Sequence, residues 1–408
     1  MTRWTGALGT VGALGGVLLM TACGGGARTA APVPIASGAS GVSGAPAAAA
    51  AASSAASVAR IAIEPKDGSR DVAPGALRVS VASGKLTQVA VVDAKGAPVA
   101  GALAADGLSW APAAGLAVGA SYRVTAQAVD AGGAVADASS GFSTLSPKQT
   151  VTASDNVVSG KEFGVGMIIR VDFQGTVKNR EAAARAITVQ ASDNTQVRGH
   201  WFDGSRLDLR PEGFWKPGTT VKVHFGTSNV ELAPGVYGGP DRDESFTIGR
   251  SKISDVDTTT HRMLVKEDGK PDTGIPVTAG SDDNPSWNGT MVVSAMSLRE
   301  EMDSATVPDI KGVGYKVFEP HALRLTDTGT YVHGNPAATV QGALGSSNIS
   351  HGCIGLSDVE GGGADTTAGR YYADSLIGDV VRVQHSVKTQ ALAPDNGLSG
   401  WNTAWANW

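Results

Sequence analysis

The residues best suited to chemistry in this 408-residue chain form the run Ser350-His351-Gly352-Cys353. A free cysteine has a pKa of about 8.5, so its thiol needs a nearby base or positive charge before it can act as a nucleophile. Two histidines are candidates for that base. His351 lies two residues before Cys353, on the same face of an extended segment, and His333 lies 20 residues upstream.

Gly352 leaves the backbone next to the cysteine uncrowded, so amide groups near Cys353 could face a developing oxyanion. A lone cysteine is commonly a buried core residue. A cysteine in a Ser-His-Gly-Cys run, with a second histidine in Tyr331-Val332-His333-Gly334, favours a catalytic nucleophile instead.

These two segments, continued by Ile354-Gly355-Leu356-Ser357, resemble the signature of the L,D-transpeptidase (YkuD-type) family. The resemblance covers roughly residues 252–387. The whole chain is similar to the actinobacterial lipoprotein subtype, which has two N-terminal immunoglobulin-like domains and a tryptophan-bearing tail such as Gly400–Trp405.

The resemblance implies a role for each matching residue. Cys353 is the expected nucleophile, His333 its base, and the Gly334 carbonyl orients that imidazole. His351 is expected to shape the site and to hydrogen-bond near the thiolate, while the amides of Gly352 and Cys353 hold the oxyanion. The expected substrate-pocket residues are Tyr315, the lid methionine Met302, Ser350 and Gly355.

Two positions depart from the family pattern. Position 355 is glycine where the family usually has Asn or Arg, which removes a side chain expected to hydrogen-bond in the substrate pocket. Position 334 is glycine where the subtype often has serine, although only a carbonyl is needed there. We therefore expect an altered substrate pocket around an intact nucleophile and base.

The implied reaction is formation of 3→3 crosslinks between diaminopimelate residues of peptidoglycan stem peptides through a Cys353 thioester, with release of D-Ala. Carbapenems are the implied covalent inhibitors, and no cofactor is expected because a thiolate, a base and an oxyanion hole suffice. Hydrolysis of the same acyl-enzyme would instead make an L,D-carboxypeptidase. A non-catalytic wall-binding lipoprotein is the alternative from another class.

The other cysteine, Cys23, ends an apolar leader in residues 1–23 that is too short for a confident membrane span. Leu19–Cys23 resembles a bacterial lipobox, in which the cysteine becomes lipidated; an ordinary cleaved signal with a chance cysteine is the alternative. Residues 24–57 are almost entirely Ala, Gly, Ser and Pro, which predicts a tether. We expect a lipid-anchored protein on the outer face of the cytoplasmic membrane, reaching into the cell wall.

The elements that must position the site are mostly β-strands. Short alternating runs separated by turn signals predict immunoglobulin-like sandwiches at 58–146 and 147–250. Tyr122 fits either a tyrosine corner or a plain core tyrosine. The second domain is expected to include a short helix at Glu181–Ala186, capped by Asn179 or a neighbour.

The catalytic domain is predicted at 251–387, with several strands, one of them at Met291–Ala295, and a final strand at Asp379–Val383. One helix is expected to start after Asp365 or Thr366 and to run to about Leu376. The tail, 388–408, is expected to pack its tryptophans on that domain. The net charge of −5 has no large single-sign block, which argues against a nucleic-acid partner. The remaining histidines have no ligand spacing, so no metal site is predicted.

Overall fold

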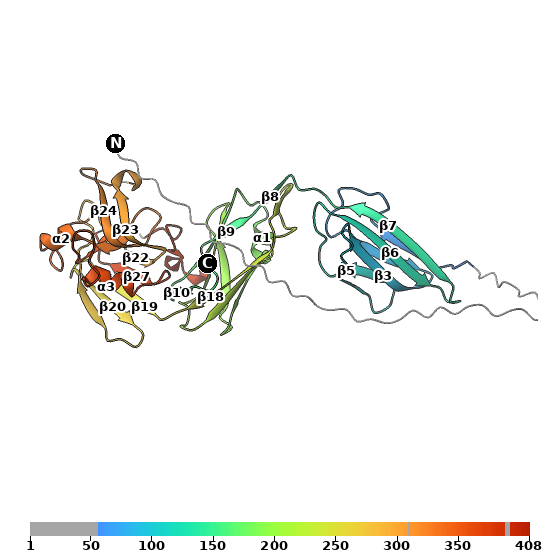
Figure 1. The fold of residues 1–408 in the computed structure, drawn as a ribbon, viewed down its shortest axis with the longest axis horizontal. Helices are drawn as coiled ribbons and strands as arrows, with labels where there is room; N and C mark the ends of the chain where they lie inside the picture. Colours follow the sequence, from blue (N-terminus) through green and yellow to red (C-terminus); the bar gives the residue numbers. More distant parts are fainter. Residues whose placement is uncertain (1–55, 309, 388–391) are drawn as a thin grey trace, which may run out of the picture. The chain divides into compact units, whose positions relative to one another are not determined.

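The computed structural model describes residues 56–308, 310–387 and 392–408. Cys23, the predicted signal segment and nearly all of the predicted linker lie outside the described residues. Strands predominate over helices in residues 56–308 and 310–387, and the helices are short (Figure 1). The prediction of a mostly β chain with immunoglobulin-like and catalytic parts is confirmed.

The first domain consists of two antiparallel sheets around a core that includes Leu77, Val124 and Trp110. Every second residue of β6 from Tyr122 to Ala128 is buried, because strand side chains alternate between the two faces. The Tyr122 hydroxyl accepts a hydrogen bond from the Ala117 amide at 3.0 Å, the geometry of a tyrosine corner. The strands are β1(Arg60–Glu64), β2(Arg78–Ala82), β5(Ser109–Pro112) and β4(Gly101–Leu103) in one sheet, and β3(Lys85–Asp93), β6(Ser121–Val129) and β7(Val135–Ser143) in the other.

The second domain has two four-stranded sheets and one small three-stranded sheet. The predicted short helix is present as α1(Arg180–Ala186), and the Asn179 side chain caps it by accepting from the Ala182 amide. The sheets are, in order, β10(Glu162–Phe163), β18(Arg242–Ile248), β15(Thr220–Phe225) and β12(Ile187–Ala191); β13(Val197–Trp201), β14(Arg206–Pro211), β11(Ile169–Phe173) and β9(Ala153–Asp155); and β16(Glu231–Ala233), β17(Val236–Gly238) and β8(Gln149–Val151).

The third domain has a five-stranded and a four-stranded sheet, and side chains from both join one apolar core. The sheets are, in order, β21(Thr273–Pro276), β20(Arg262–Glu267), β19(Lys252–Asp257), β27(Val380–Gln384) and β22(Gly289–Val292); and β23(Ala295–Asp303), β24(Lys316–Arg324), β25(Tyr331–Gly334) and β26(Ile354–Leu356). The helices are η1(Ser304–Thr306), α2(Pro336–Val340), α3(Thr367–Ala373), η2(Gly400–Asn402) and η3(Trp405–Asn407).

Local details of the third domain differ from the predicted elements. The strand expected at Met291–Ala295 is two strands, since β22 ends at Val292 and β23 begins at Ala295. Helix α3 is capped by Thr366 as expected but ends at Ala373, three residues early. Helix α2 was not predicted, although Asn335 and Pro336 supply an N-cap and a first-turn proline.

The tail tryptophans lie on the second domain, which corrects the expectation that they pack on the catalytic domain. Trp401 Nε1 donates to the Gly166 carbonyl at 2.8 Å. The Arg210 guanidinium lies 4.8, 5.3 and 4.2 Å from the ring centroids of Trp401, Trp405 and Trp408. Buried Arg210 attracts the aromatic faces by cation–π contact. Asn402 joins the tail to the catalytic domain through two hydrogen bonds with the Thr290 backbone, both 2.8 Å.

Candidate active site

The nucleophile and its base come from two neighbouring strands. Strand β25 pairs in parallel with β26, and the register places His333 opposite Gly355. Val332 and Ile354 point into the core of the domain. Since side chains alternate along a strand, His333 and Cys353 share the opposite face. Both are buried, with exposed fractions of 4% and 7%.

The His333 ring is held in one tautomer by the backbone. Its Nδ1 lies 2.7 Å from the Gly334 carbonyl oxygen, and a carbonyl only accepts, so Nδ1 carries a hydrogen. This leaves Nε2 for proton exchange with Cys353, which is close enough to raise the His333 pKa. The structure therefore places Gly334 where the sequence analysis expected an orienting carbonyl.

The charge state of His333 is set by its neighbours. Burial lowers the pKa of a histidine, but here hydrogen bonds and charge attraction from Cys353 and Glu319 prevail and raise the His333 pKa to about 10. Glu319 Oε2 lies 3.6 Å from His333 Nδ1. The site therefore favours the imidazolium form of His333. Glu319 was missed by the sequence analysis, because no spacing rule links it to His333.

Two of the expected pocket residues lie against the thiol. Met302 of β23 and Tyr315 pack against Cys353 in a small apolar cluster. The Tyr315 ring lies 4.7 Å from that of exposed His351, centroid to centroid. Burial and the nearby charges of Cys353 and Glu319 raise the pKa of Tyr315 to about 12, so its hydroxyl keeps its proton.

The side chain of Ser350, expected in the substrate pocket, is buried and hydrogen-bonded within the turn that precedes Cys353. Its hydroxyl donates to the Cys353 carbonyl at 2.6 Å and accepts from the Gly352 amide at 3.1 Å. Gly352 itself has φ +111°, a conformation that favours glycine. Because the Gly352 amide is used in this turn, the amide of Cys353 is the better oxyanion donor.

Gly334 is a glycine because a buried carboxylate lies against it. A Cβ at this position would meet Asp358 Oδ2 at 2.1 Å. That oxygen is held 2.7 Å from His321 Nδ1, and Asp358 Oδ1 accepts hydrogen bonds from Val359, Gly363 and Thr366. The departure from the family pattern at 334 therefore accompanies a buried His–Asp pair beside the orienting carbonyl.

A cavity of about 330 Å³ opens beside the nucleophile, with Trp287, Ile310, Lys311, His351 and Gly352 in its lining. Its wall includes Thr328 to Thr330, and the Gly329 carbonyl oxygen lies 3.7 Å from Cys353 Sγ. Residues outside the catalytic domain hold the loop that contains Thr328–Thr330. Arg170 pairs with Asp327 at 2.8 Å, and the Asn396 side chain makes two hydrogen bonds to Thr328.

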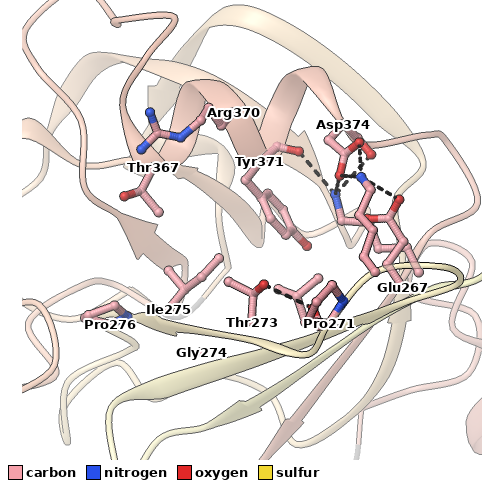
Figure 2. A pocket seen from close by; sticks show the side chains of 13 residues that line it. Glu267, Pro271, Thr273, Gly274, Ile275, Pro276, Thr367, Arg370, Tyr371 and Asp374 are labelled. Atoms are coloured by element: carbon pink, nitrogen blue, oxygen red, sulfur yellow. Dashed lines mark hydrogen bonds and ion pairs between the residues drawn. The ribbon is translucent and has the colours of Figure 1, made fainter.

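A separate cavity of about 340 Å³ lies between α3 and the β20–β21 hairpin (Figure 2). Its charged groups bind one another. Buried Lys252 Nζ contacts the Tyr371 and Asp374 carbonyls and the Ser375 hydroxyl, and Lys270 pairs with Glu267 and Asp374. None of the expected site residues lines it, so the chemistry belongs to the Cys353 face.

Comparison with known proteins agrees with this geometry. The model of the L,D-transpeptidase catalytic domain matches residues 251–386. The model of a bacterial Ig domain matches residues 69–231, a range that spans parts of both N-terminal β-domains.

Two curated relatives match most of the chain. L,D-transpeptidase 2 of Mycobacterium tuberculosis is 32% identical over 345 residues, which are 84% of this chain and 82% of that protein. L,D-transpeptidase 5 of the same organism is 28% identical over 360 residues, 86% of this chain and 76% of that protein.

A solved structure of Mycobacterium tuberculosis L,D-transpeptidase 3, in complex with a faropenem-derived adduct, is 26% identical with a TM-score of 0.45, over 57% of this chain and 98% of that one. The length of the match to L,D-transpeptidase 2, together with the catalytic-domain match over the segment that holds Cys353 and His333, shows that the chain belongs to the L,D-transpeptidase family.

Proposed function

We propose that this enzyme crosslinks peptidoglycan stem peptides by two-step acyl transfer through Cys353, forming 3→3 bonds between diaminopimelate residues. The observation that carries the proposal is the fixed His333 ring: its Nδ1 hydrogen is held by the Gly334 carbonyl and its other nitrogen is free to exchange a proton with Cys353. The imidazolium–thiolate pair is the reactive form for acyl transfer.

In the first step, Cys353 Sγ attacks the carbonyl carbon at the L-centre of diaminopimelate in a tetrapeptide donor. The oxyanion that forms accepts hydrogen bonds from the Cys353 amide and from the Tyr315 hydroxyl, which is kept protonated. The bond to the terminal D-Ala breaks, the D-Ala nitrogen takes the proton from His333, and a thioester remains on Cys353.

In the second step, the side-chain amine of diaminopimelate in another stem attacks the thioester carbonyl. His333, now neutral, accepts a proton from that amine. The carbon–sulfur bond breaks, and the imidazolium–thiolate pair is restored. Cys353 and His333 thus return to their starting protonation states at the end of the cycle.

Incubation of the enzyme with a disaccharide-tetrapeptide, followed by mass spectrometry, tests the proposal. Crosslinked dimer with release of D-Ala is expected, and a Cys353→Ala variant should give neither. Disaccharide-tripeptide without dimer would show an L,D-carboxypeptidase, and unchanged substrate with no adduct on Cys353 would show a non-catalytic protein.

We also propose that carbapenems acylate Cys353. A β-lactam carbonyl presents the same electrophile to the thiolate, and its ring nitrogen is a leaving group that His333 can protonate. Intact-mass measurement should show one adduct on the wild-type protein and none on Cys353→Ala. Absence of the adduct on the wild type contradicts this proposal.

We propose in addition that Cys23 is lipidated and anchors the enzyme outside the cytoplasmic membrane. The lipobox-like Leu19–Cys23 and the Ala/Gly/Ser/Pro-rich segment after it support this. Among residues 56–308, 310–387 and 392–408, no helix has the length and apolar character to cross a bilayer. Expression with labelled palmitate should label the wild type but not Cys23→Ser, and equal labelling of both contradicts the anchor.

A further inference from the structure

The side chain of Asn335 occupies the space directly over Gly355. A Cβ built on Gly355 would lie 3.0 Å from Asn335 Cβ, 3.1 Å from Asn335 Nδ2 and 2.7 Å from Thr278 Cγ2. Thr278 is fully buried and its hydroxyl is bonded to the Ser347 carbonyl and the Ile349 amide, so it has little freedom to move. Position 355 therefore has no room for a larger residue while Asn335 lies there.

Asn335 lies beside the reacting groups. Gly355 is opposite His333 in the parallel pairing of β25 and β26. Ile354 and Leu356 point into the core, so Gly355 faces the same side as Cys353. The Asn335 amide, in contact with Gly355, is therefore at the edge of the face that carries the nucleophile and the base.

The orientation of this amide is fixed by helix α2. Asn335 Oδ1 accepts the Ala338 amide at 2.8 Å as the N-cap, which turns Nδ2 toward Gly355. Among the described residues, Nδ2 of Asn335 donates no hydrogen bond. Asn335 is only partly buried, so these two N–H donors are open to a ligand.

We infer that Asn335 Nδ2 positions the acyl donor by donating a hydrogen bond to a carbonyl or carboxylate oxygen of its stem peptide. Gly355 leaves the amide where it is, since a Cβ there would crowd Asn335 at 3.0 Å as well as buried Thr278 at 2.7 Å. Asn335 thus supplies from the α2 N-cap the polar contact that is missing at position 355. This inference rests on the proposed transpeptidase function and names a positioning residue for it.

Two substitutions of Asn335 separate the role of its Nδ2 as a hydrogen-bond donor from the role of its Oδ1 as the N-cap of α2. Asn335→Ser keeps a capping oxygen but loses the amide, and Asn335→Asp keeps the capping oxygen but replaces the donor by a negative oxygen. We expect KM for the tetrapeptide donor to rise about 5- to 10-fold in Asn335→Ser, as for loss of one hydrogen bond, with kcat nearly unchanged. Asn179→Ser is the matched control, because Asn179 caps α1 in the second domain in the same way.

The charge of the bound oxygen follows from a second comparison. If Nδ2 binds the free carboxylate of diaminopimelate, Asn335→Asp should raise KM more than Asn335→Ser, and amidation of that carboxylate should remove the difference. If Nδ2 binds a peptide carbonyl, the two variants should respond alike to both donors.

Carbapenem acylation of Cys353, measured by intact mass, checks that each variant keeps its nucleophile. Acylation at wild-type extent with a raised KM for the donor supports the inference. A KM within twofold of wild type in both variants, or an equal rise in Asn179→Ser, overturns it and leaves the proposed function intact. A wild-type protein that forms no acyl-enzyme from the donor overturns the proposed function and this inference together.

Discussion

Replacement of Glu319 by glutamine removes the carboxylate that lies 3.6 Å from His333 Nδ1. At this distance two unit charges attract by about 4 to 5 kcal/mol at an effective dielectric constant of about 20. Solvent reaches 18% of the Glu319 side chain and screens part of this attraction, while Cys353 still favours the imidazolium. We therefore expect the His333 pKa to fall by about two units, equivalent to about 2.7 kcal/mol.

The sign of the pH effect follows from the role of the imidazolium as proton donor. The His333 pKa is raised to about 10, so the wild-type acylation rate should decline only as the pH rises toward that value. In Glu319→Gln the decline should begin about two pH units lower. The imidazolium also stabilises the fold: this contribution is complete below the ordinary histidine pKa of 6.5 and is lost as the pH rises through about 10.

The assay is stopped-flow measurement of carbapenem ring opening across the pH range, with the Cys353 adduct confirmed by mass. Glu319→Asp keeps the charge and should stay close to wild type. Glu301→Gln removes a more exposed carboxylate from the same hairpin, one paired with Lys316. It should leave unchanged the alkaline pH at which the acylation rate declines. The reasoning would be refuted if the acylation rate declined at the same alkaline pH in Glu319→Gln and in the wild type. It would also be refuted if the wild-type rate declined near the ordinary histidine pKa.

Three further predictions concern the base His333, the neighbouring Gly334 whose carbonyl orients it, and the packing of the C-terminal tail on Arg210. His333→Ala should lower the carbapenem acylation rate about 10³-fold and, because the stabilising imidazolium is lost, should also lower the melting temperature of the folded protein; wild-type-like acylation refutes the base role. Gly334→Ala forces a Cβ to 2.1 Å from Asp358 Oδ2 and should cost about 2 kcal/mol in a denaturant melt. Gly75→Ala, where the Cβ meets nothing within 4 Å, is its control, and equal stability of the two variants contradicts the packing argument. Arg210→Met leaves the partly buried Thr403 carbonyl of the tail without its donor, so about 2 kcal/mol should be lost and acrylamide should quench the tail tryptophans more strongly; unchanged quenching contradicts this.

The sequence predicted the elements whose signals are local. The alternation in Tyr122–Val129 marks β6, and Asn179 before an alanine-rich turn marks α1. Cys353 and His333 were recognised because a nucleophile and a base have few residue types to choose from. Their placement on neighbouring strands then follows from one parallel register.

The contacts that were missed join residues with no fixed spacing. Glu319 reaches His333 from β24, across a sheet whose register the sequence did not specify. The Ser350 hydroxyl faces inward because the turn at Gly352 has a positive φ, which residue types alone do not determine. The tail tryptophans have no periodicity, and their partner Arg210 lies about 190 residues earlier in the chain. For Asn335 a signal was available, since Asn-Pro is a common start of a helix.

The Gly329 loop, which contacts Cys353, is held in place by residues that lie outside the range matched by the family. The structural unit around the active site is therefore larger than the family match. The family match covers residues 251–386, but the Gly329 loop is held by Arg170 from before this range and by Asn396 from after it. Val292 and Val380 of the catalytic domain and Leu398 of the tail also lie in the apolar core of the second domain. A fragment cut at the family boundary would therefore expose that shared core and free one wall of its own active site. In this enzyme the unit that can be moved between proteins is the second domain, the catalytic domain and the tail together.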